Sequence, residues 1–152
     1  MEKIQIALVV SEFNFDISYL MLERAKEHAI FLGAQITYIC KAPGSFDMPI
    51  LIESLLEKQD VNAVVTLGAI VEGETKHDEI IAQHVTRKVT DLSVKYRKPV
   101  SLGVSGPGMS RIQGLERIDE YAKRAVEAAV KMVKRIRILK EIKVTQYPTM
   151  VE

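Results

Sequence analysis

Short apolar runs alternate with longer amphipathic segments along the chain. Four of these runs are rich in β-branched residues and predict strands at residues 4–10, 36–40, 63–67 and 100–104. Segments with apolar residues at helical spacing follow them and predict helices at residues 17–32, 49–59, 77–96 and 111–139. The predicted order is therefore β-α repeated four times, with a break or kink in the last helix near residues 118–121.

Residues at the expected boundaries support these elements. Asp16 can cap the first helix, and Gly33 suits its C-terminal end. Pro49 falls in the first turn of the second helix, where its missing N–H costs nothing. Ser110 and Gln113 have the spacing of a capping box, the reciprocal arrangement that begins a helix.

The alternation of strands and helices implies an α/β fold with a parallel sheet and helices on both faces. Right-handed crossovers make a flavodoxin-like, doubly wound, three-layer α/β/α arrangement with a four-stranded parallel sheet the simplest solution. We expect a single domain over residues 1–152, with residues 144–152 as a flexible tail. Four strands make a small sheet whose edges both need cover, which favours an oligomer.

The composition is that of a globular protein, because 47% of the 152 residues are apolar and 27% are charged. The 21 Lys and Arg residues against 20 Asp and Glu give a net charge of +1, so nucleic acid is not an expected partner. No apolar run approaches the ~18–20 residues of a membrane span, and the first strand leaves no room for a signal peptide. The single cysteine, Cys40, is expected as a buried thiol in a reducing compartment, which favours a cytoplasmic protein.

Unusual residues gather in the segments that leave the predicted strands. Aromatic residues, glycines and polar groups are frequent in four such segments, residues 11–15, 42–49, 68–77 and 105–110. The segments that enter strands show no such clustering. In open α/β sheets ligands bind outside the carboxyl ends of the strands, so a binding site is expected there. The alternative is that these loops simply need turn residues.

Two features point to anion binding and proton transfer. Gly73, Glu74 and Thr75 open the third predicted helix, where free N–H groups can hold a phosphate; the alternative is an ordinary threonine cap. His77 follows and suits proton transfer near neutral pH, although a lone histidine is more often structural. His84 is expected too far down the helix to share the site. The three histidines lack the spacing of metal ligands, so no metal is expected.

Four further side chains have two interpretations each. Phe13 and Phe46 can stack on a flat heterocycle or plug the core. Asp47 can accept hydrogen bonds from a polyol or cap the second helix. Arg117, two turns into the last helix, can be solvated or can pair with a phosphate or carboxylate.

Taken together, these segments resemble the 6,7-dimethyl-8-ribityllumazine synthase family over residues 4–139. The motifs that carry the resemblance, in the right order, are Glu12-Phe13-Asn14, Pro43-Gly44-Ser45-Phe46-Asp47-Met48-Pro49, Gly68-Ala69-Ile70-Val71-Glu72-Gly73-Glu74-Thr75-Lys76-His77, Leu115-Glu116-Arg117 and Glu127-Ala128-Ala129. The Ser105-Gly106-Pro107-Gly108 segment is similar to the archaeal branch.

The resemblance implies an enzyme, a transferase, that condenses 5-amino-6-(D-ribitylamino)uracil with 3,4-dihydroxy-2-butanone 4-phosphate in the penultimate step of riboflavin synthesis, without a cofactor. It makes His77 the proton-transfer residue. It assigns the pyrimidine and ribityl chain to Phe13, Asn14, Ser45, Phe46, Asp47, Ile70, Val71, Leu102 and Arg124. It assigns the phosphate to Glu74 and Thr75, chiefly through backbone N–H groups and the threonine hydroxyl, and to Arg117.

The resemblance also implies a homo-oligomer, since Leu102 and Arg117 reach the site from the adjacent subunit of a pentameric ring. The short turn after Arg117 favours a 60-subunit shell of twelve pentamers. The chain departs from the family pattern at Glu12, Asp47 and Leu102, and Arg124 fits the basic position near the ring better than Lys123. Two alternatives are an archaeal riboflavin synthase, disfavoured by the phosphate-binding residues, and a non-catalytic flavin-binding or shell protein, disfavoured by the intact loops.

Overall fold

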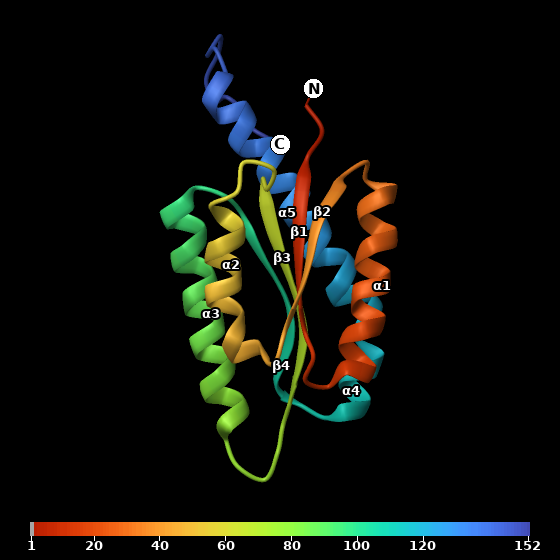
Figure 1. Cartoon of the computed structure of the whole chain (residues 1–152). Coiled ribbons are helices and arrows are strands. Elements are labelled where there is room, and N and C mark those ends of the chain that lie inside the picture. The colour runs from red at the N-terminus through yellow and green to blue at the C-terminus, as the bar shows by residue number, and fades with distance from the viewer. Residues whose placement is uncertain (1) are drawn as a thin grey trace.

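Four parallel strands form one sheet at the centre of the molecule (Figure 1). The computed structural model describes residues 2–152, and its strands are β1 (Gln5–Ser11), β2 (Gln35–Ala42), β3 (Ala63–Val71) and β4 (Val100–Met109). They lie in the order β2-β1-β3-β4. The chain therefore reverses its direction of winding between β1 and β3, where a crevice forms at the carboxyl ends of the strands.

Helices cover both faces of the sheet. They are α1 (Phe15–Phe31), α2 (Met48–Leu56), α3 (His77–Tyr96), α4 (Arg111–Glu116) and α5 (Ile118–Glu141). α1 and α5 pack on one face, and α2 and α3 pack on the other (Figure 1). Among residues 2–152, no helix has both the length and the apolar character that a membrane crossing needs.

Alternation along β1 builds the two halves of the core. Ile6, Leu8 and Val10 pack with α1 and α5, whereas Ala7 and Val9 pack with α2 and α3. All five side chains are buried, because a central strand between two helical layers has no face open to water. The predicted flavodoxin-like three-layer α/β/α fold is confirmed.

Three strands are longer than predicted: β2 by three residues, and β3 and β4 by four and five. β3 continues to Val71 and β4 continues through its Gly-Pro-Gly segment to Met109, where these two residues pair after a register shift. The prediction that residues 105–110 form a loop is therefore wrong for all but the last residue. Glycine and proline normally indicate a turn, but at a sheet edge an irregularity can absorb them without ending the strand.

Helix boundaries also differ in detail from the prediction. α1 begins at Phe15 after Asn14, whose backbone is left-handed at φ 56°, so Asp16 lies inside the helix and does not cap it. α2 ends at Leu56, three residues early. The predicted break in the last helix is real but falls at Arg117, which joins α4 to α5. The Ser110 capping box is present as predicted.

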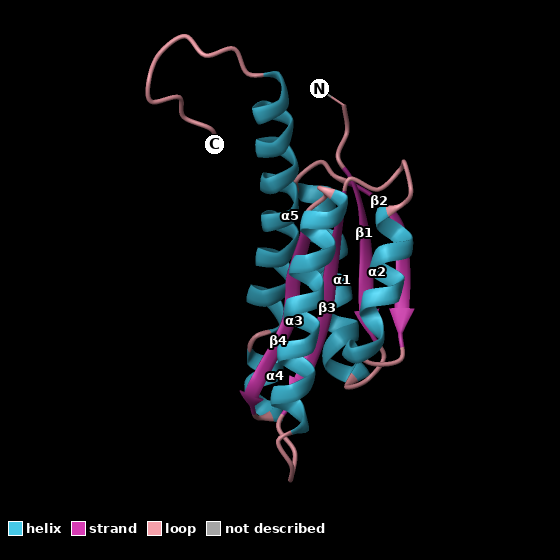
Figure 2. Ribbon diagram, turned by 90° about the vertical axis from the view of Figure 1, so that its left-hand side faces the viewer, coloured by secondary structure: helices cyan, strands magenta, loops and turns pink. Residues whose placement is uncertain are grey.

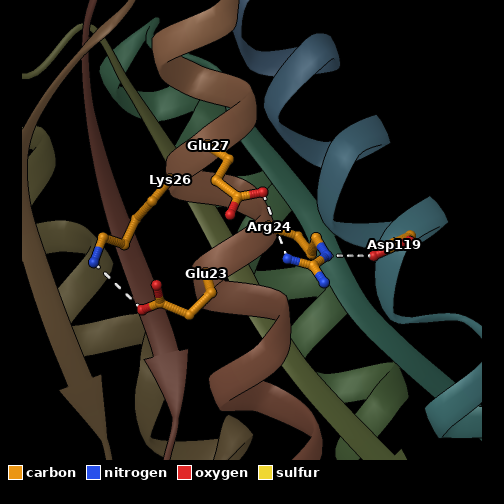
Figure 3. A network of polar contacts seen from close by, with 5 residues as sticks. All are labelled: Glu23, Arg24, Lys26, Glu27 and Asp119. Atoms are coloured by element: carbon orange, nitrogen blue, oxygen red, sulfur yellow. Dashed lines mark hydrogen bonds and ion pairs between the residues drawn. The ribbon is translucent and has the colours of Figure 1, made fainter.

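Polar contacts join α1 to α5 along the surface (Figure 3). Arg24 Nε donates to Asp119 Oδ1 at 2.8 Å, and Arg24 also pairs with Glu27 within α1. These groups are exposed, so such pairs stabilise the fold by only ~0–1 kcal/mol each. Burial of apolar side chains between the two helices is the stronger link.

The edge strand β2 and the C-terminal region are the least covered parts of the molecule. Cys40 on β2 is half-buried, so the prediction of a fully buried thiol is wrong. The reason is that β2 has a neighbouring strand on one side only. Figure 2 shows α5 running past the sheet, and residues 142–152 after it form no helix or strand.

Candidate active site

Segments that leave three neighbouring strands line one depression of about 330 Å³ at the carboxyl ends of the strands. It lies at the β1/β3 reversal, where an open α/β sheet places its ligands. Seven of the predicted site residues line it together: Phe13, Ser45, Phe46, Ile70, Val71, Thr75 and His77. The predicted position of the site at this end of the sheet therefore coincides with a real depression.

The segment after β1 presents Phe13 to the solvent-facing side of this depression. Its ring is 70% exposed, which excludes the core-plug interpretation. Asn14 holds the segment in place, because its Nδ2 donates to the Ala69 carbonyl at 2.9 Å and its Oδ1 accepts from Arg111 Nη1 at 3.3 Å. The amide of Asn14 thus links the turn to the end of β3, and Asn14 itself does not line the depression.

A tight turn after β2 presents the second aromatic ring. Phe46 is 58% exposed, so it is not a core plug either. Asp47 Oδ2 accepts from the Gly44 N–H at 3.0 Å and makes no bond to the first turn of α2, so its role is to close the turn that carries Phe46. Ser45 is buried at the floor.

His84 stands directly behind Phe46. Their rings stack with centroids 4.9 Å apart and an interplanar angle of 25°. The prediction that His84 lies too far down α3 to share the site agrees with its absence from the lining. His84 nevertheless supports a ring that does line the depression. Helical spacing alone could not predict this contact, because it depends on how the turn between β2 and α2 packs against α3.

The segment after β3 supplies the polar end of the depression. α3 begins at His77, so Gly73 and Thr75 precede the helix rather than open it, which corrects the prediction. Thr75 and His77 both line the depression, and Glu74 is exposed beside them. The first N–H groups of a helix have no partner within it, so this end offers donors to an anion.

Five lining residues are not among those that the family resemblance assigns to the site: Gly44, Ala69, Gly73, Asp78 and Ile81. Of these, only Gly73 is part of the predicted anion-binding segment. Ile81 follows His77 by one helical turn, so the period of the helix could have found it. Asp78 is 8% exposed, and its Oδ2 accepts from the Gly108 N–H at 3.1 Å. An acid in the first turn of a helix is common, so its sequence position gave no signal.

A second depression, of about 380 Å³, lies at the opposite end of the sheet between α3, β4 and α5. Its walls are mainly apolar. Lys98 is part of the lining, but its Nζ is held by structural bonds, since it donates to the carbonyls of Leu56 and Lys58 at 2.8 Å each. Burial lowers the pKa of Lys98. With no histidine or carboxylate in its lining, this depression offers no group for proton transfer near neutral pH.

The geometry can be compared with known proteins. A family model described as 6,7-dimethyl-8-ribityllumazine synthase matches residues 3–137. The chain belongs to the 6,7-dimethyl-8-ribityllumazine synthase family. Proteins of that name from Pyrobaculum calidifontis, Archaeoglobus fulgidus and Methanocaldococcus jannaschii are 57%, 58% and 56% identical to it. The alignments cover 92%, 90% and 91% of this chain and 93%, 95% and 97% of the relatives.

Membership confirms the resemblance and the interpretation as a transferase of riboflavin biosynthesis. The match spans every strand and nearly all of α5, so it includes each segment that lines the depression. The riboflavin synthase and non-catalytic alternatives are not favoured. Among residues 2–152, no three histidine, cysteine or acidic side chains gather as a metal site.

Six residues that the family resemblance assigns to the site do not line the depression. Asn14, Asp47 and Glu74 lie in the segments around it, whereas Leu102, Arg117 and Arg124 lie on other elements. Leu102, on β4, is 44% exposed. Arg117 is half-buried at the α4–α5 junction, and its guanidinium makes no hydrogen bond or ion pair within residues 2–152. Arg124 is exposed on α5 and pairs with Glu120 at 2.9 Å. One chain thus brings together the aromatic and phosphate loops but not this second group.

Proposed function

We propose that the depression lined by Phe13, Phe46 and His77 binds 5-amino-6-(D-ribitylamino)uracil and 3,4-dihydroxy-2-butanone 4-phosphate and joins them into 6,7-dimethyl-8-ribityllumazine. The reaction releases one inorganic phosphate and two water molecules. The observation that carries the proposal is the convergence of two exposed aromatic rings with Thr75 and His77 in a single depression. Holding two substrates in reacting geometry can supply ~7–11 kcal/mol of the barrier.

The aromatic side of the depression suits the pyrimidine. Phe13 is free to stack on its flat face, and Ile70 and Val71 offer an apolar wall at the end of β3. Ser45 and the turn closed by Asp47 lie where the ribityl chain would run, so backbone groups there can meet its hydroxyls. Asn14 acts on Phe13 through the turn that it anchors.

The polar end suits the phosphate-bearing substrate. The backbone N–H groups near Glu74 and Thr75, together with the Thr75 hydroxyl, can donate to phosphate oxygens. His77 is exposed at the same end, where an imidazole can move protons as the Schiff base forms and the phosphate leaves. The side chain of Glu74 is exposed, so its charge need not face the anion.

A second copy of the chain would complete the site. In this proposal Leu102, Arg117 and Arg124 of a neighbouring subunit close the depression, within a homopentamer and a shell of twelve pentamers. The support is that Leu102 is exposed and the guanidinium of Arg117 has no partner within the part of the chain that the structure describes. An Arg guanidinium suits this task because its donors match a phosphate in two-point contact.

The activity is tested by adding both substrates to the purified protein and following lumazine fluorescence and free phosphate together. Stoichiometric appearance of both above the uncatalysed background is the expected result. Binding of lumazine or riboflavin without turnover would instead favour a flavin-binding or shell protein.

The shared site is tested by mixing two variants, His77→Ala and Arg117→Ala, after dissociation and reassembly. When the phosphate-bearing substrate is kept well below its wild-type KM, each variant alone has low activity. A mixed assembly contains some sites with both residues intact, so activity returns toward a quarter of wild type for random mixing. A mixture of two His77→Ala preparations is the control. Absence of recovery in verified mixed assemblies would place both residues in one subunit's site.

A further inference from the structure

The loop between β3 and α3, residues 72–76, is attached at both ends to two consecutive residues of β4. At its start, the Glu72 N–H donates to the Met109 carbonyl at 2.9 Å. Just beyond its end, Asp78 Oδ2 accepts from the Gly108 N–H at 3.1 Å. The loop that carries Glu74 and Thr75 is therefore fixed to β4 by one hydrogen bond at each end.

The anchoring segment of β4 is itself firmly seated. A Cβ on Gly106 would lie 2.2 Å from the Ile70 carbonyl oxygen, so the backbones of β4 and β3 are in direct contact there. Gly108 has φ +67°, in the left-handed region that favours glycine. The direction of the Gly108 N–H is thus set by the backbone, and the acceptor that meets it lies at the start of α3.

Asp78 meets it from a nearly buried position. It is 8% exposed, lines the same depression as Thr75 and His77, and makes no other side-chain hydrogen bond within residues 2–152. A carboxylate at the edge of an anion site disfavours the anion by like-charge repulsion. Its presence there indicates a role other than direct phosphate binding.

We propose that Asp78 is a positioning residue, which fixes the phosphate loop by holding the start of α3 to Gly108. This inference rests on the proposed function, since it takes residues 72–76 as the loop that receives the phosphate. Asp78 acts through the loop and need not touch the substrate. The simpler alternative is that Asp78 only stabilises the helix dipole, as acids in a first turn commonly do.

Glu79 allows the two roles to be separated, because it is also an acid in the first turn of α3 but is exposed and bonds to nothing in β4. Three variants are compared: Asp78→Ala, Asp78→Asn and Glu79→Ala. Asp78→Ala should raise the KM for the phosphate-bearing substrate about five- to tenfold, which lies within the net contribution of one typical hydrogen bond. The KM for ribitylaminouracil should change less than about twofold.

Asp78→Asn keeps an oxygen acceptor for Gly108 and removes the charge, so it should restore the phosphate-substrate KM to the wild-type value or below it. Glu79→Ala should leave both KM values unchanged. Equal effects of Asp78→Ala and Glu79→Ala would overturn the proposal in favour of the dipole role. An Asp78→Asn variant as impaired as Asp78→Ala would also overturn it, because the charge and not the bond would then matter.

Hydrogen–deuterium exchange provides a readout that does not depend on activity. Peptides covering residues 72–78 and 105–110 should exchange faster in Asp78→Ala than in Asp78→Asn, and the Gly108 amide should be protected in the wild type. If Asp78→Ala does not fold, the wild-type and Asp78→Asn measurements still test the positioning role of Asp78. An unprotected Gly108 amide overturns the positioning role, whereas absence of product from wild type overturns the proposed function instead.

Discussion

The two groups of predicted site residues differ in how far one chain organises them. Phe13, Phe46, Thr75 and His77 come from three separate segments yet line one depression. Leu102 lies on β4, Arg117 at the junction of α4 and α5, and Arg124 on α5. None of them lines that depression. The first group is assembled by the crossovers of a parallel sheet, whose strand ends necessarily meet at one edge. The second group has no such reason to converge within the chain.

The difference teaches that one folded chain can bring together one part of a predicted site and leave another part dispersed. The first group is held by internal contacts, such as the Asn14 amide on Ala69 and the His84 ring behind Phe46. In the second group, Leu102 is exposed and Arg124 bonds only to Glu120, one turn away on the same helix. Variants in the two groups should therefore differ in which kinetic constant they change.

The largest effect is expected from His77→Ala. Loss of a general acid–base group typically costs ~10²–10⁴-fold in rate. Because His77 is exposed, water can take over part of its proton transfer, so we expect a loss of about 10²-fold in kcat. Lumazine binding, measured by fluorescence titration, should survive. A kcat equal to that of wild type would remove His77 from the mechanism.

Arg117→Ala should come next, with a change mainly in the KM for the phosphate-bearing substrate. A hydrogen bond to a charged group is worth ~1.5–3 kcal/mol, which corresponds to about a ten- to hundredfold rise. Steady-state kinetics with each substrate varied in turn would measure it. Lys131→Ala, which removes an exposed charge from α5, is the matched control. If both variants raise the KM equally, Arg117 acts only by adding positive charge near the anionic substrate and not by a direct contact.

His84→Ala should have a smaller effect, confined to ribitylaminouracil. The stacked ring behind Phe46 is worth ~0.5–1.5 kcal/mol, so the KM for this substrate should rise about two- to tenfold. Gln83→Ala, an exposed neighbour on α3, controls for changes in the helix. A rise in the KM for the phosphate-bearing substrate instead would show that α3 has shifted as a whole.

The smallest effect is expected from Asp16→Asn, which concerns stability alone. A side-chain hydrogen bond from Arg111 lowers the pKa of Asp16 below its ordinary value of 3.8. The ionised pair therefore stabilises the fold above that pH, and its contribution is lost as the pH falls through the lower folded-state pKa. Exposed pairs contribute at most about 1 kcal/mol.

Thermal unfolding at pH 7 and at about pH 3 measures this effect. Asp16→Asn should be slightly less stable than wild type at pH 7, and the gap should narrow at the lower pH. Asp119→Asn, which removes the exposed partner of Arg24, provides a comparison at the contact between α1 and α5. A gap that stays constant with pH would mean that the carboxylate charge of Asp16 contributes nothing.

The sequence by itself determined the α/β order, the doubly wound sheet and the end of the sheet where the depression lies. These follow from local periodicity and from the rule that parallel strands end at one edge. It also gave most of the lining residues, because the motifs at strand ends carry them. Its errors fall where local signals compete with distant ones: Gly106 and Gly108 indicate a turn, yet pairing with β3 keeps them in β4.

The tertiary structure alone decided which side chains act together. It set His84 against Phe46, committed Asp47 to its own turn, and gave Asp78 a partner thirty residues away in Gly108. Each of these contacts joins residues on different elements, so no periodicity within one element encodes it. The relative placement of elements depends on how side chains fill the space between them, and that is fixed only when the whole core packs.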